Sequence, residues 1–150
     1  RDIHIPEIIK QSSKKIKKEF IKGIGDTEFS LVFKKRYKNK HYYPVISFST
    51  QSKNLQKDII EILTELGFNL WYISEYPTSR NGKPLFTNQI NLNGVGNLNL
   101  WMKEIGFNST KHLTKYNVWK KYGVCPSKTN ILQRQKILKG EIDINSFKGL

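Results

Sequence analysis

The spacing of apolar positions changes near residue 28, and the change separates a predicted helix from a predicted strand. Ser13, a residue type that commonly caps helices, precedes a segment in which apolar side chains recur every three or four positions. From Phe29 onward apolar and polar side chains alternate, which is typical of a strand with one buried face. The predicted buried face of the helix consists of Ile16, Phe20, Ile24 and Thr27.

Hairpin and helix patterns continue through the rest of the chain. A turn at 38–40 follows the first strand, and Gly67 is well suited to end the next helix in a left-handed conformation. The predicted elements are a strand over 42–50, a helix over 55–66, strands over 70–76 and 86–92 joined by a long polar turn over 77–84, and helices over 98–105, 110–122 and 128–138.

This order predicts an α+β fold, an αββαββα unit with a four-stranded antiparallel sheet and helices on one face. A chain of 150 residues is long enough for one ordinary domain with a small appendage. We therefore expect three parts: an N-terminal segment over 1–12, the αββαββα domain over 13–122, and a C-terminal helical extension over 123–150.

The charge balance indicates a polyanionic partner. The chain has 26 lysines and arginines against 12 acidic residues, a formal net charge of +14, and such an excess destabilises a compact fold unless a partner offsets it. No apolar run approaches the roughly 18 residues of a membrane-spanning helix, and the lysines are spread along the chain, which disfavours membrane anchoring. Nucleic acid is the partner that this composition favours. The single cysteine, Cys125, excludes an internal disulfide and a cysteine-based zinc site.

The face of the predicted sheet that the helices leave open would be cationic, aromatic and rich in hydrogen-bonding groups. A two-stranded ribbon fits the major groove of B-DNA, where such side chains contact base edges and phosphates. The alternative is an ordinary solvated sheet face. The expected outward residues are Lys34, Arg36, Lys38, Ser47, Ser49, Tyr72, Ser74, Tyr76, Thr87 and Gln89.

The segment 21–28 ends the first predicted helix with two acids spaced by one residue, directly before the basic strand. It resembles the motif of the LAGLIDADG homing endonucleases, with Gly23 at the first glycine, Asp26 at the first acid and Glu28 at the second. In that family two motif helices pack together, and the resemblance assigns this packing to Gly23 and Asp26. It also implies that Glu28, with the backbone carbonyl of Thr27, binds Mg²⁺ or Mn²⁺.

The resemblance extends from about Pro6 to about Trp119, because the order of elements matches as well as the motif. It implies a metal-dependent, site-specific endonuclease that cuts double-stranded DNA, in the cytoplasm of a prokaryote or in an organelle. Lys111 and Gln51 match a basic and a polar position that accompany the metal in the family. Since one motif is present and two strands must be cut, we expect a homodimer or pairing with a second motif-bearing half.

Alternatives remain at this stage. The motif departs from the family pattern at Gly25, Thr27 and Phe29, so the same fold could serve as a non-cleaving DNA-binding regulator or as an intron RNA maturase. A structural RNA-binding protein of unrelated fold would explain the charge but not the acid-Thr-acid ending of the helix. The sequence starts at Arg1, without a methionine, and the 5–9 segment is similar to the approach to a second motif in longer members, so one of the alternatives is a piece of a longer protein.

Overall fold

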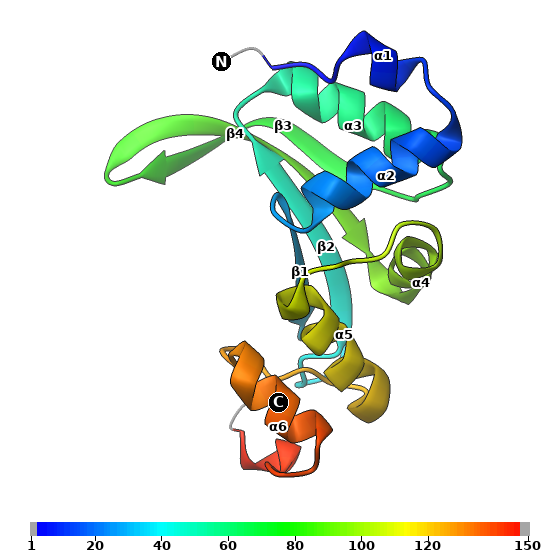
Figure 1. Cartoon of the computed structure of the whole chain (residues 1–150). Coiled ribbons are helices and arrows are strands. Elements are labelled where there is room, and N and C mark those ends of the chain that lie inside the picture. Colours follow the sequence, from blue (N-terminus) through cyan, green and yellow to red (C-terminus); the bar gives the residue numbers. More distant parts are fainter. Residues whose placement is uncertain (1–2, 148–150) are drawn as a thin grey trace.

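A four-stranded antiparallel sheet with the strand order β1-β2-β4-β3 lies at the centre of the computed structural model, which describes residues 3–147 (Figure 1). Residues 1–2 and 148–150, at the ends of the two predicted terminal segments, lie outside this range. The elements are α1 (Glu7–Lys10), α2 (Lys14–Gly25), β1 (Phe29–Lys34), β2 (Tyr43–Thr50), α3 (Lys53–Glu65), β3 (Trp71–Arg80), β4 (Lys83–Asn93), α4 (Gly94–Glu104), α5 (Thr110–Tyr122), α6 (Ile131–Leu138) and the 3-10 helix η1 (Ile144–Ser146). The predicted α+β class is confirmed.

The core lies between one face of the sheet and the helices α2, α3 and α4. Strand register places Leu31, Ile46 and Leu92 side by side on this face, and all three are almost completely buried. Trp101 of α4 is fully buried in the same cluster. Burial of each such side chain stabilises the fold by about 1.5–3 kcal/mol. We call the opposite face of the sheet, which these helices do not cover, the outer face.

Helix α2 begins where predicted but turns a different side to the core. The Ser13 hydroxyl accepts a hydrogen bond from the backbone N–H of Ile16 at 3.3 Å, which confirms the predicted cap. The buried residues of the helix are Lys17, Ile21 and Gly25, whereas Ile16 is 48% exposed. The predicted buried face is therefore wrong for Ile16 and for Thr27, which is also exposed.

Two ion pairs fix this orientation of α2. The Lys17 ammonium lies 2.6 Å from the Glu65 carboxylate at the end of α3, and that of Lys18 lies 2.5 Å from Glu104 at the end of α4. Lysine stems cover apolar surface while the charged group reaches a partner. An apolar-periodicity pattern counts Lys17 as polar, so it could not identify this side of the helix as buried.

The predicted long polar turn over 77–84 is wrong, because both strands continue to a two-residue turn. Asn81 and Gly82 have φ values of 52° and 74°, as the central residues of the tight hairpin turn that matches strand twist require. Arg80 pairs with Lys83 across this turn. In Figure 1 the resulting hairpin arm, residues 76–87, extends past the helix layer as a green ribbon.

A β-bulge between Ile73 and Tyr76 shifts the register of β3 against β4. The backbone groups that the bulge leaves unpaired are satisfied by side chains. The Gln56 amide, which is buried, donates to the Ile73 carbonyl at 3.0 Å, and Asn88 accepts from the backbone N–H of Glu75 at 2.9 Å. Because a bulge moves the following side chains to the other face, Tyr76 lies on the outer face.

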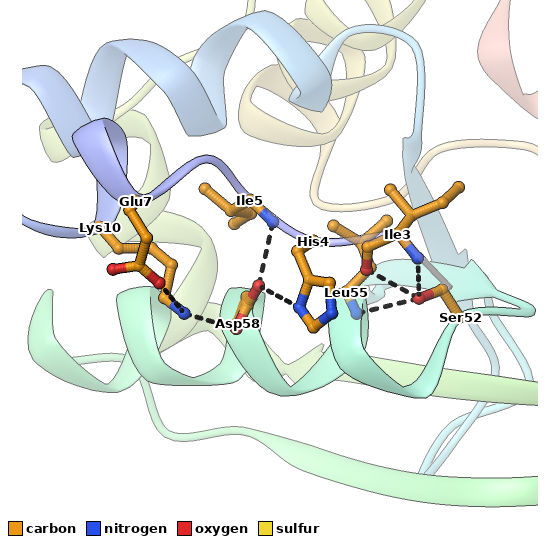
Figure 2. A network of polar contacts seen from close by, with 8 residues as sticks. All are labelled: Ile3, His4, Ile5, Glu7, Lys10, Ser52, Leu55 and Asp58. Atoms are coloured by element: carbon orange, nitrogen blue, oxygen red, sulfur yellow. Dashed lines mark hydrogen bonds and ion pairs between the residues drawn. The ribbon is translucent and has the colours of Figure 1, made fainter. Parts of the chain in front are cut away.

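The N-terminal segment lies along α3 and is held there by two side chains of that helix region (Figure 2). The Ser52 hydroxyl bonds both backbone groups of Ile3, at 3.1 and 2.9 Å. The buried Asp58 carboxylate accepts from the backbone N–H of Ile5 at 2.9 Å and lies 3.2 Å from the Lys10 ammonium. This hydrogen bond with Asp58 raises the pKa of Lys10. The segment is therefore an ordered part of the fold.

The C-terminal helices pack against the end of the β1–β2 hairpin. The Trp119 indole N–H donates to the Tyr42 carbonyl at 2.9 Å, and the backbone N–H of Cys125 donates to the His41 carbonyl at 3.0 Å. These contacts place α5 beside the edge strand β1, and α6 packs against α5 (Figure 1). Among the described residues, no helix has the length and apolar character needed to cross a membrane.

Candidate nucleic-acid interface and acidic motif

The outer face of the sheet carries polar side chains from both central strands. Strand register aligns Ser47 with Asn91 and Ser49 with Gln89, one position away from the buried residues of the core. Tyr76 joins this face and is 47% exposed. Four of the expected residues therefore lie on the outer face: Ser47, Ser49, Gln89 and Tyr76.

The prediction that Tyr72 and Ser74 lie on the outer face is wrong. Tyr72 pairs with Ile90, a core residue, and so lies on the helix side of the sheet. The Ser74 hydroxyl donates to the Gln56 side chain of α3 at 2.7 Å. Before the bulge the predicted alternation is displaced by one position in this strand, so Trp71 lies on the outer face and is about half exposed.

The basic residues after β1 occupy two different settings. Lys34 ends the strand and is exposed, in register with Tyr43. Arg36 and Lys38 lie in the loop 35–42, because β1 ends at Lys34, before the turn predicted at 38–40. Tyrosines hold these two side chains: the Arg36 guanidinium lies 4.5 Å from the centre of the Tyr43 ring, a distance at which a cation is attracted to an aromatic face.

One hollow of the outer face collects several predicted contact residues at the end of β2. The Ser49 and Thr87 hydroxyls hydrogen-bond to each other at 2.5 Å there. Thr87 is nearly buried, so it supports Ser49 and does not face solvent as predicted. Arg80, from the hairpin arm, is a cation of this hollow that the sequence analysis missed because it lay in the predicted turn. The lining consists of Ser49, Thr50, Gln51, Thr78, Ser79, Arg80, Leu85, Thr87 and Gln89.

The two acids of the motif have different surroundings. Asp26 follows α2, and one oxygen of its carboxylate accepts hydrogen bonds from the backbone N–H groups of Asn108 and Ser109, both at 2.9 Å. A carboxylate before a helix N-terminus also interacts favourably with the helix dipole, so Asp26 ties the end of α2 to the start of α5. Glu28 is exposed, and within residues 3–147 its carboxylate makes no hydrogen bond or ion pair.

The two glycines of α2 also differ in their surroundings, since one lies against a buried side chain and the other has open space. A Cβ atom at Gly25 would lie 3.0 Å from the ring of Trp101, so this glycine is needed for the close contact between α2 and α4. A Cβ atom at Gly23 would have no neighbour within 4 Å. The fold of the described chain therefore explains Gly25 but gives no reason for Gly23.

Glu28 and Gln51 lie at the same end of the sheet. Phe29, which follows Glu28, pairs with Phe48 near the end of β2, and Gln51 directly follows that strand. Lys111 is exposed in the first turn of α5, two residues after the Ser109 N–H that Asp26 holds. The structure thus places the three predicted catalytic residues around the end of α2, although no direct contact joins them.

The His112 side chain is buried close to Asp26 of the motif. Its ring stacks on Phe107 with 4.5 Å between centroids. Burial lowers the pKa of His112, and the nearby Lys115 and Lys111 lower it further, while Asp26 acts in the opposite direction. A neutral, stacked imidazole is a packing group, so His112 helps to hold α5 in place.

Within residues 3–147, no group of three or more histidine, cysteine, aspartate or glutamate side chains could hold a metal ion. At this end of the sheet, the oxygen atoms that could bind a metal ion are those of the exposed Glu28 carboxylate and of the neighbouring backbone. A hard divalent cation prefers several oxygen ligands, which a single exposed carboxylate does not provide.

No protein-family model matches the chain, and neither the curated proteins nor the solved structures contain a significant match.

Proposed function

We propose that the protein binds double-stranded DNA on the outer face of its sheet and hydrolyses it as a pair of motif-bearing units, in the manner of a LAGLIDADG homing endonuclease. The observation that carries the proposal is the uncovered outer face, where Ser47, Ser49 and Gln89 form polar rows between the basic loop 35–42 and the basic tip of the hairpin arm. Phosphate contacts from the cations would orient the duplex, and the polar rows would contact base edges.

The net charge of +14 supports the same partner. A protein that neutralises several phosphates releases condensed counterions, and this release supplies much of its affinity for DNA. The hairpin arm adds Arg80 and Lys83 at its tip. A DNA substrate also favours a compartment that contains DNA, which we propose to be the cytoplasm of a prokaryote or an organelle.

Glu28 is the residue that we propose for the reaction. An exposed carboxylate beside a cationic DNA-binding face repels phosphate unless a cation lies between them. Glu28 and the backbone carbonyl of Thr27 would hold Mg²⁺ or Mn²⁺, which supplies an activated water and neutralises charge on the phosphate. Lys111 would hold the scissile phosphate by charge, and Gln51 would orient groups at the same end of the sheet.

Pairing of two units would use the outward side of α2. Ile16, Phe20 and Ile24 are apolar and only partly covered within the chain, and Gly23 leaves open space between them. A second α2, from another copy or from another half of a longer protein, would fill this space and bring a second Glu28-like acid to the metal. Gly23 would permit the close approach of the two backbones.

The second candidate is a protein on the same fold that binds DNA, or intron RNA as a maturase, without cutting. The observation in its favour is the lack of a three-ligand metal group within residues 3–147. Binding on the outer face is common to both candidates, so cleavage is what separates them.

The experiment combines binding and cleavage on duplex DNA of randomised sequence. Affinity is measured from dilute to physiological salt for the parent, for Lys34→Gln with Arg36→Gln, and for Lys136→Gln with Lys139→Gln. The first pair should reduce the salt slope by about 1.8, since each lost phosphate contact accounts for about 0.9. The second pair removes the same charge from exposed positions of α6 and its C-cap and should change the slope less.

Strand scission is then assayed with the parent in Mg²⁺ on the same library, followed by sequencing of the ends. Cleavage at a restricted set of sequences supports the endonuclease. Salt-dependent binding without scission transfers the assignment to the non-cleaving candidate. An affinity for DNA that is indifferent to salt contradicts both.

A further inference from the structure

The segment that contains α5 and α6 is basic and has no acidic residue. Residues 105–140 contain eight lysines and arginines and no aspartate or glutamate. Elsewhere the 12 acids are interspersed with the remaining cations and form ion pairs such as Lys17–Glu65. This segment therefore carries positive charge only.

Arg134 of α6 is the most unusual of these cations, because it is only 2% exposed. Its guanidinium donates to the Thr114 hydroxyl at 2.8 Å, to the backbone carbonyl and hydroxyl of Thr129, and to the Lys111 carbonyl at 3.4 Å. All of these acceptors are neutral, and within residues 3–147 no carboxylate lies within ion-pair distance of Arg134. Buried charges in proteins are normally paired, so the positive charge here lacks its usual counterpart.

Lys115 lies next to this guanidinium and is half-buried. Its ammonium donates to the Leu31 carbonyl of β1 at 3.1 Å. Burial lowers the pKa of Lys115, and the charges of Arg134 and Lys111 lower it further. Three cations thus converge on one small region, where an anion would remove their mutual repulsion.

The same region is hollowed. Two adjoining hollows share Lys115 and Thr129: one reaches Val32 and Lys128, and the other reaches Lys111 and Arg134. We call them together the α5–α6 groove. Lys128 is exposed and has a left-handed backbone, with φ 59°, a conformation that is uncommon for a non-glycine residue and tends to occur at functional sites.

The groove continues the outer face of the sheet past its β1 edge. Val32 alternates with the core residues Leu31 and Phe33 and so lies on the outer side of β1, and it also lines the groove. A polymer that lies on the outer face and extends beyond β1 would therefore meet Lys128 and Lys115 next.

We propose that the α5–α6 groove binds backbone phosphates of the DNA segment that flanks the part lying on the sheet. The identity of the polymer rests on the proposed function, whereas the anion-binding property rests on the groove itself. Contacts of this kind hold the duplex in position and are independent of base sequence. The groove would give the C-terminal extension a role in lengthening the DNA footprint.

The test compares Lys115→Met with Lys128→Gln, as single and double variants, on random-sequence duplexes of two lengths. The methionine keeps most of the volume of Lys115 and removes a charge that burial disfavours, so the variant should fold. Lys128→Gln changes an exposed side chain and serves as the variant least able to disturb the fold. The matched control is Lys136→Gln with Lys139→Gln, with the same loss of charge on exposed positions of α6 and its C-cap.

With the longer duplex, the double groove variant should reduce the salt slope by about 1.8, for two lost phosphate contacts. With a duplex only long enough to cover the sheet, it should match the parent. The control should behave like the parent on both lengths. Equal losses for groove and control variants, or equal losses on both lengths, overturn the proposal.

A second measurement uses inorganic pyrophosphate, which needs no DNA. The melting temperature of the parent should rise with pyrophosphate beyond the rise in sodium chloride of equal ionic strength, and the double groove variant should lose this difference. If the parent binds no DNA but shows this stabilisation, the proposed function fails and the anion groove stands. If the parent shows no stabilisation, or keeps it in the double variant, the groove proposal is overturned whatever the DNA result.

Discussion

Helix α2 and the acidic residues that follow it have two sides. Contacts within the chain account for the residue types on one side but not for those on the other. On the inner side, Lys17 pairs with Glu65, Gly25 lies against Trp101, and Asp26 holds the start of α5. Each of these residues makes a specific contact that depends on its residue type. They would be required in a chain that acted alone.

On the outer side, Ile16 is half exposed, Gly23 has open space around it, and Glu28 has no side-chain partner within the described residues. An exposed isoleucine, a helical glycine and an acid beside a basic face each cost some stability or binding energy. The difference indicates that the inner set maintains the fold, whereas the outer set serves a partner and a reaction. The following substitutions test this division, starting with the largest expected effect.

Asp26→Ala should destabilise the fold by about 2–3 kcal/mol, because it removes an ionic acceptor of two backbone N–H groups. Glu28→Ala, two residues away, should change the free energy of unfolding by less than about 0.5 kcal/mol. Urea unfolding of both variants gives the comparison. Similar losses for the two acids would show that Glu28 also has a structural role.

Gly25→Ala should destabilise the protein by about 1–2 kcal/mol. The new methyl group would lie too close to the buried Trp101 ring, an overpacking cost that exceeds the gain of about 1 kcal/mol in helix propensity. Thermal unfolding measures the loss. A stability equal to that of the parent would mean that α2 can move away from α4 without penalty.

Gly23→Ala should have the opposite sign and stabilise the isolated unit by about 1 kcal/mol, because alanine favours the helix and meets no neighbour. If α2 pairs with a second α2, the larger Gly23→Leu should abolish self-association while the unit remains folded. Sedimentation velocity at several concentrations reports association. A dimer that persists in Gly23→Leu would exclude this side of α2 as the interface.

Ile16→Ser should have the smallest effect on the unit itself, within about 0.5 kcal/mol, since the side chain is already half in water. The dimer, by contrast, should weaken, because the buried apolar area at its interface decreases. Circular dichroism and sedimentation on the same samples separate the two effects. A marked loss of stability without change in association would place Ile16 in the core.

The order and type of the elements were predictable from the sequence because hydrophobic spacing differs so clearly between helix and strand. The range of α5, Thr110–Tyr122, agrees with the prediction, and Ser13 was correctly predicted as a cap. The outer part of the hairpin arm, residues 77–84, was not predicted as strand because it contains no large apolar side chain, so no alternation indicates a strand there. The Asn81–Gly82 pair is a strong sequence signal for the two-residue turn at this position.

The arrangement of the candidate site was less predictable. The bulge before Tyr76 depends on buried amide groups of Gln56 and Asn88 that lie far away in sequence. The link from Asp26 to residues 108–109 likewise joins segments more than 80 positions apart. The periodicity of a sequence predicts local structure only. It therefore indicated candidate residues but could not distinguish Asp26, which accepts two hydrogen bonds, from the exposed Glu28.

The measurement that tests the account most directly is strand scission by Glu28→Gln, which removes the charge and keeps the shape of the side chain. The parent, Glu28→Gln and the control Glu61→Gln, which alters an exposed acid of α3, are incubated with the randomised duplex library in Mg²⁺, and binding is measured in parallel in Ca²⁺. We predict that Glu28→Gln loses cleavage and binds DNA as tightly as the parent or more tightly, because a carboxylate that repels phosphate is gone, while Glu61→Gln cuts normally. Cleavage by Glu28→Gln at the rate of the parent would contradict the account, since Glu28 would then not be the metal ligand.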